Sequence, residues 1–150
     1  MKIFEYDRTS AYEYAKKWAF GRNPAFYDFS RIGGDCTNFA SQCIYAGAGI
    51  MNYTPTFGWF YKSANDRTPS WTGVEYLYNF LVNNEGAGPF AEEAPLDKLE
   101  VGDIVQLGRS TGDFYHSPVV VSVRGGRILV AAHSYDAFNK PLSSYSFAQA

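Results

Sequence analysis

The run from Gly33 to Cys43 constrains this chain more than any other segment, because it sets a cysteine where a helix is expected to begin. Asp35 is a favourable N-cap residue, so Cys36 is predicted to be the first helical residue. Gly33 and Gly34 keep side chains away from the sulfur, and the free amides and dipole of a helix start favour a thiolate. These features together predict that Cys36 is a nucleophile.

Spacing within the predicted helix indicates where the sulfur points. Phe39, Ala40, Cys43 and Ile44 follow Cys36 at helical intervals, so Cys36 heads an apolar stripe at the rim of the core. Cys43 lies two turns further on, roughly 10 Å away, which is too far for a disulfide, and we expect it to be core filler. A small buried hydrophobe is the alternative interpretation of Cys36 itself.

Thiol chemistry needs a base, and both histidines of the chain, His116 and His133, fall in one predicted β-hairpin. A valine-rich strand follows His116, Gly125-Gly126 is a turn signal, and a second strand runs to His133. A two-residue turn pairs Arg124 with Arg127.

That register places His133 opposite Pro118, on the same face as His116. The two imidazoles would then be diagonal neighbours, about 7 to 8 Å apart along the backbone, so that one could orient the other. A capping or surface role is the alternative for either histidine. Their spacing from the cysteines fits no standard zinc site, and we expect no cofactor.

The chain resembles a known family, the putative amidase domain family, which is similar to the NlpC-type and CHAP-type cysteine amidohydrolases with their papain-like core. The resemblance extends from about Ala11 to Ser143, nearly the whole chain. It rests on the following segments: Gly33 to Cys43, Leu99 to Gln106, His116-Ser117 opening a valine-rich strand, and Ala132-His133-Ser134 closing the next.

The resemblance implies roles for individual residues. Cys36 matches the nucleophile at the start of the central helix, and His116 matches the general base. His133 matches the third, orienting polar position on the next strand. Asp35 matches the acidic residue before the cysteine, which in relatives helps to shape the substrate site, although helix capping is an equally open role here.

Further site residues follow from the mechanism and from the aromatic content. The Cys36 N–H would meet the oxyanion, and Asn23 or Tyr27 could supply a second donor, with loop closure as the alternative role. Aromatic residues make 18% of the chain, enough to form a stacking wall in the loop after the central helix. Trp59 and Trp71 are the candidates for lining substrate, with burial in the core as the alternative.

The chain is expected to form a single domain over residues 1–150 of α+β class, with helices first and then a small antiparallel sheet. The expected elements are the following: helices over Ala11–Phe20, Cys36 to about Gly47, and Trp71–Val82; a long loop over Ile50–Trp71; a first core strand over Val101–Leu107; and the histidine-bearing hairpin.

Composition excludes several classes of function. A net charge of −2 without a basic cluster argues against a nucleic-acid partner. The sequence has no apolar run of membrane-spanning length, and Met1 to Asp7 lacks a signal-peptide core. Localisation and oligomeric state are left open, since the chain could be a module of a longer exported protein.

The sequence therefore predicts a cysteine-dependent amide hydrolase that acts through a thioester. By resemblance, its substrate would be a peptidoglycan amide or peptide bond. The alternative from a different class is a non-catalytic, aromatic-lined module that binds cell-wall glycan or peptide. A thiol acyltransferase would use the same residues and differ only in the acyl acceptor.

Overall fold

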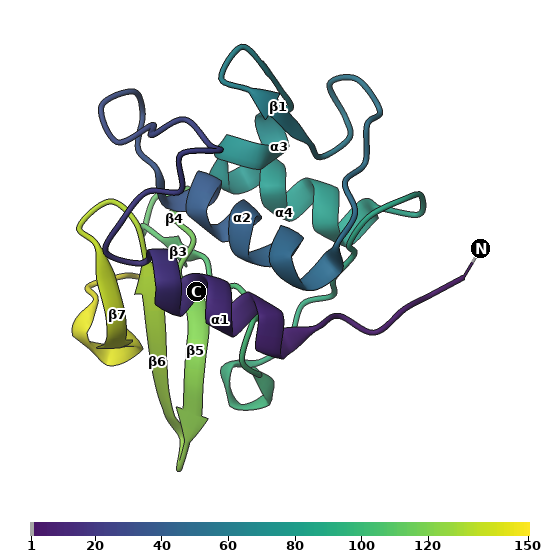
Figure 1. Cartoon of the computed structure of the whole chain (residues 1–150). Helices are drawn as coiled ribbons and strands as arrows, with labels where there is room; N and C mark the ends of the chain where they lie inside the picture. The colour runs from purple at the N-terminus through teal and green to yellow at the C-terminus, as the bar shows by residue number, and fades with distance from the viewer. Residues whose placement is uncertain (1) are drawn as a thin grey trace.

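The structure is a computed structural model that describes residues 2–150 (Figure 1). Its helices and strands run in the following order: α1 Arg8–Trp18, α2 Cys36–Ala48, β1 Tyr61–Ser63, β2 Asp66–Arg67, α3 Pro69–Thr72, α4 Val74–Asn83, a 3-10 turn Leu96–Lys98, β3 Leu107–Gly108, β4 Phe114–His116, β5 Val119–Arg124, β6 Arg127–Ala132, β7 Ala137–Pro141, and a 3-10 turn Leu142–Ser144. The class is mixed α+β with small antiparallel sheets, as predicted. The papain-like core stays a prediction.

The four helices gather at one end of the molecule, and the β5–β6 hairpin extends away from them (Figure 1). Helix α1 contacts α2 on one side and β5 and β6 on the other, so it joins the helical layer to the sheet. Strand β6 lies between β5 and β7 in the three-stranded sheet, while β3 pairs with β4 and β1 pairs with β2. The start of α2 therefore lies against the sheet end of the helical layer, in contact with β6.

Helix α2 begins at Cys36, as the sequence predicted, and it ends where glycine allows the chain to turn. Gly49 closes α2 with a φ of 75° and donates its N–H to the Tyr45 carbonyl. Gly33 and Gly34 both have positive φ, at 82° and 100°, so the turn into the helix requires glycine at these positions. Cys43 is fully buried in the core, as expected.

The β5–β6 hairpin has the predicted turn, but the pairing of its two strands shifts by one residue further along the hairpin. Arg124 pairs with Arg127, which confirms the two-residue turn at Gly125-Gly126. A bulge between Val120 and Ser122 then shifts the pairing, so that Val119 faces Ala131 instead of Ala132. The expectation that His133 lies opposite Pro118 is therefore wrong, since one extra residue in a strand moves every later partner.

Three further elements differ from the sequence prediction. The expected loop over Ile50–Trp71 contains the short β1–β2 hairpin and the start of α3. The predicted helix over Trp71–Val82 is two helices, because Gly73 adopts an extended conformation between α3 and α4. The predicted strand over Val101–Leu107 is reduced to β3 and an isolated bridge between Ile104 and Val119.

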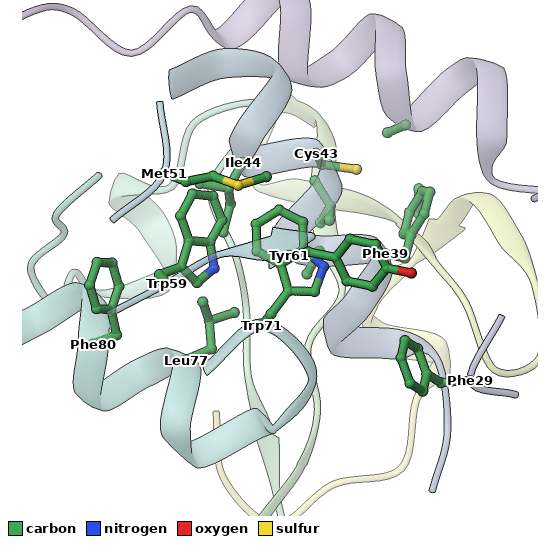
Figure 2. Close-up of a cluster of buried hydrophobic side chains, with 14 of the residues drawn as sticks. Phe29, Phe39, Cys43, Ile44, Met51, Trp59, Tyr61, Trp71, Leu77 and Phe80 are labelled. Carbon is green, nitrogen blue, oxygen red and sulfur yellow. The ribbon is translucent and has the colours of Figure 1, made fainter. Parts of the chain in front are cut away.

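The main core packs between α2, α3 and α4 and is rich in aromatic rings (Figure 2). Trp59 and Trp71 are its two largest side chains, and neither has any exposed surface. Their ring centroids lie 4.6 Å apart. Each indole N–H is satisfied by a residue of α2, since Trp59 donates to Ser41 and Trp71 donates to Asn38. These bonds fix α2 against the rest of the core.

A Trp71→Ala variant is expected to lose about 3–5 kcal/mol of unfolding free energy, because it removes a large buried ring and orphans the amide of Asn38. Urea denaturation followed by circular dichroism measures this loss. Phe57→Ala is the matched control, since Phe57 is 85% exposed, and this variant should unfold within about 0.5 kcal/mol of the parent. Equal stability of the two variants would contradict this assignment of the core.

Candidate active site

Cys36 stands at the first position of α2, and its side chain is partly exposed. Its sulfur lies 3.7 Å from Thr37 Oγ1, and the Thr37 hydroxyl lies 3.3 Å from the hydroxyl of Ser117. Ser117 directly follows His116 in the chain, so the predicted nucleophile is linked through Thr37 to the residue next to the predicted base. No hydrogen bond joins Cys36 to His116 within residues 2–150.

Burial keeps both of these groups uncharged. It raises the pKa of the Cys36 thiol, and hydrogen bonds from Thr37 and the Ser117 backbone only partly offset this effect. Burial, together with the nearby positive charge of Lys140, lowers the pKa of His116 to about 4. At neutral pH the resting pair is therefore a thiol and a neutral imidazole. The thiolate that the helix start was expected to favour is not the resting form.

His116 is bracketed by two tyrosine rings. The Tyr115 ring lies nearly parallel to the imidazole with centroids 6.4 Å apart, and the Tyr145 ring lies 5.5 Å away on a tilt. The position of Tyr115 comes from an irregularity in the β3–β4 pair, where Leu107 faces His116 but Gly108 faces Phe114. Tyr115 is thus the extra residue of a bulge, which is how a strand turns two neighbouring side chains toward one side.

Asp35 does not cap α2 with its side chain, although it occupies the N-cap position. Its carboxylate is fully buried and accepts hydrogen bonds from the Phe29 N–H at 2.8 Å and the Asn38 amide at 2.9 Å. The other carboxylate oxygen lies 2.6 Å from Nδ1 of His133. The capping role considered for the Asp35 side chain is therefore wrong, while its role in shaping the substrate site stays a prediction.

His133 is also fully buried, and its hydrogen bonds do not go to His116. Nδ1 faces Asp35, and Nε2 lies 2.9 Å from the Trp18 carbonyl oxygen. These two contacts fix the orientation of the imidazole ring between Asp35 and Trp18. The ring also stacks on Phe39 at 4.0 Å between centroids. The expectation that one imidazole orients the other is therefore wrong, because both ring nitrogens of His133 are engaged by residues other than His116.

Sequence reasoning missed the residues that surround this buried pair. Arg22 forms two hydrogen bonds with the Asp136 carboxylate, at 2.9 and 3.0 Å, and lies 3.2 Å from Nε2 of His133. Ser134 accepts the Asp35 backbone N–H through its hydroxyl at 3.0 Å. The turn after β6 thereby holds the chain segment that enters α2. The positive φ of Ser134, 58°, is the local feature that aims it there, and no sequence pattern signals it.

The two oxyanion candidates lie in different settings. The amide of Asn23 donates to the Tyr14 hydroxyl at 3.1 Å, and its oxygen accepts from the Ala25 N–H at 2.9 Å. Asn23 thus closes its own loop, which was the alternative role. The Tyr27 side chain is 45% exposed, while its backbone is held by the Tyr61 hydroxyl and the Asn38 amide. Only Tyr27 presents an available group to solvent.

The predicted substrate-lining role of Trp59 and Trp71 is wrong, because both rings are buried without exposed surface.

Among the described residues no group of three or more His, Cys, Asp or Glu side chains is placed to hold a metal ion. The described helices are also too short or too polar for any of them to cross a membrane.

Comparison with known proteins places this arrangement in a family. Residues 5–150 match the sequence profile described as "Putative amidase domain". The chain is 34% identical over 140 residues to "Uncharacterized protein YhbB" of Bacillus subtilis (strain 168), covering 91% of this chain and 44% of that protein. The chain thus spans less than half the length of this relative. No solved structure matches significantly. The chain belongs to the putative amidase domain family, whose described activity is amide hydrolysis.

Proposed function

We propose that this domain is a cysteine-dependent amide hydrolase in which Cys36 is the nucleophile and His116 is the general base. The observation that carries the proposal is the contact of the Cys36 thiol, through the Thr37 hydroxyl, with the hydroxyl of Ser117, the residue next to His116, at the start of a helix. A helix start supplies backbone N–H groups for a developing oxyanion. Cys36 is partly exposed, so a substrate carbonyl can reach its sulfur.

The chemistry follows from the protonation states of the pair. A neutral His116 accepts the thiol proton as the sulfur attacks the amide carbonyl, and the Cys36 N–H donates to the oxyanion. The hydroxyl of Tyr27 is the candidate for a second donor. His116 then passes the proton to the leaving amine as the C–N bond breaks. Water, deprotonated by the same imidazole, cleaves the resulting thioester and returns the thiol.

Asp35 and His133 act as positioning residues in this scheme. Their buried pair ties the α2 entry segment to the end of β6, and both side chains have almost no exposed surface. His133, which matches the third catalytic position of the family, thus holds the helix start in this scheme. His116 alone transfers the proton. A peptidoglycan amide or peptide bond is the proposed substrate class, on the strength of the family resemblance.

A combined turnover and alkylation assay tests the proposal. Short N-acylated peptides and peptidoglycan fragments are incubated with the protein, and released amines are quantified. We expect turnover that is lost in parallel with alkylation of Cys36 by iodoacetamide, with substrate slowing the alkylation. The alternative, a non-catalytic binding module, predicts that the peptides protect Cys36 while no amine is released. Turnover that survives full alkylation of Cys36 would contradict the cysteine mechanism.

The pH profile of kcat/KM supplies a second prediction. The active form needs an unprotonated His116, whose pKa is lowered to about 4, so kcat/KM should rise through this pH and be level near neutrality. A Lys140→Gln variant removes a nearby cation that disfavours the imidazolium, so its acid limb should move to higher pH. Arg124→Gln, at the distant hairpin turn, should leave the limb in place. An acid limb near pH 6.5 in all three proteins would contradict the neutral pair.

A further inference from the structure

A broad depression of about 450 Å³, largely open to solvent and called the cavity below, lies beside the bulge at Tyr115. It is lined by one strand pair and by the segment after β7: Gly108, Arg109, Ser110, Tyr115, Ser146, Phe147 and Ala148. Tyr115 belongs to both places, since its ring lines the cavity and also lies beside the His116 imidazole. The cavity thus shares one residue, Tyr115, with the surroundings of the His116 imidazole.

Two cations stand over the tyrosine rings that bracket His116. The Arg109 guanidinium lies 4.3 Å from the centroid of the Tyr115 ring, and the Lys140 ammonium lies 4.0 Å from the centroid of the Tyr145 ring. A ring face fixes the position of a cation without neutralising its charge. Each of the two rings that contact the base thus carries a positioned positive charge, in a chain whose net charge is −2.

The acidic groups nearby leave this positive character in place. Asp113 pairs with Arg109, but the two side chains are about half exposed, so the pair gains little and exchanges readily for another carboxylate. Asp113 is also held by the Thr111 hydroxyl. Glu75 of α4 accepts a hydrogen bond at 3.4 Å from the N–H of Phe114, which lies in β4 two residues before His116. Lys140 makes no ion pair within residues 2–150.

We propose that this cavity binds the leaving-group side of the substrate, and that the leaving amine carries a carboxylate recognised by Arg109, which lines the cavity, with Lys140 adding positive charge from the Tyr145 ring beside His116. The inference rests on the proposed function, in which His116 protonates the leaving amine, because that step places the amine portion of the substrate next to His116. A cavity of this size accommodates one or two amino-acid residues. The preferred substrate class is thus an amide of an amino acid or short peptide with a free carboxylate.

Binding to a Cys36→Ala variant tests the inference separately from turnover. N-acetyl-alanyl-alanine and its C-terminal amide differ only in the charge at the end that should enter the cavity. We expect the carboxylate peptide to bind about tenfold tighter, as for a charge-assisted hydrogen bond, and this preference to shrink with added salt. Equal affinity of the two peptides, or no detectable binding of either, would overturn the inference.

Charge variants test which residues cause the preference for the carboxylate peptide over its amide. Arg109→Gln and Lys140→Gln, each combined with Cys36→Ala, should reduce the ratio of the two affinities several-fold, while Arg124→Gln should leave the ratio unchanged. An undiminished ratio in both site variants would overturn the assignment to this cavity. The parent protein is then assayed for hydrolysis of the same peptides. Selective binding without turnover would count against the proposed function alone, and turnover without selectivity would count against the cavity alone.

Discussion

A Cys36→Ala variant is expected to lose amide hydrolysis by at least about 10⁴-fold in kcat, because no other group described here replaces the sulfur as nucleophile. Its fold should be retained, since Cys36 is partly exposed and contributes little to the core. Cys43→Ala is the matched control. It removes the other thiol, which is buried two turns along the same helix, so it should lower stability while leaving turnover close to that of the parent.

His116→Ala completes this comparison. Loss of a general base typically costs 10²- to 10⁴-fold in rate, so we expect this variant to retain a low residual activity. Steady-state kinetics on a single peptide substrate, with circular dichroism to check folding, measure all three variants. If Cys36→Ala kept more than about a tenth of the parental kcat, the thiol would not be the nucleophile, and the hydrolysis would need another attacking group.

An Asp35→Ala variant is expected to lose at least about 3 kcal/mol of unfolding free energy, because several buried hydrogen-bonding groups lose their partner at once. The truncation leaves His133, the Phe29 N–H and the Asn38 amide without their acceptor in a site with almost no solvent access. Urea denaturation measures the loss. Asp35→Asn keeps an acceptor of the same shape, so it should lose less.

Glu100→Ala provides the control for this prediction. Glu100 pairs with Arg8 at 3.3 Å, but its side chain is 67% exposed, so its removal should cost less than about 1 kcal/mol. A similar small loss in Asp35→Ala would contradict the view that the Asp35–His133 pair holds the start of α2. Reduced turnover in Asp35→Asn with unchanged alkylation of Cys36 would be consistent with a positioning role.

The elements that the sequence predicted well are those with a strong local signal. The start of α2 was predicted to the residue, because two glycines and an N-cap residue precede an apolar stripe. The hairpin turn at Gly125-Gly126 was equally clear. Both signals come from residues within a few positions of each other, so the local structure they predict depends little on tertiary packing.

The arrangement around the site depends on features without a local signal. A bulge at Val121 shifts the strand register, and His133 then lies against Asp35. The valine run that contains this bulge has no glycine or other residue that marks an irregularity. The residues around Tyr115 likewise carry no sequence signal for the bulge at that position. Arg22 meets Asp136 and His133 across more than a hundred residues, and such long-range partners follow from the fold and not from spacing.

The most direct test of the central claim is a search for the acyl-enzyme. The protein is mixed with p-nitrophenyl acetate, whose activated leaving group makes acylation faster than hydrolysis, then quenched in acid and analysed by mass spectrometry. We predict a burst of one equivalent of p-nitrophenolate and an acetyl group on the peptide that contains Cys36, removable by hydroxylamine and absent in Cys36→Ala. Steady release without a burst, or an acetyl group only on other residues, would contradict the thioester mechanism.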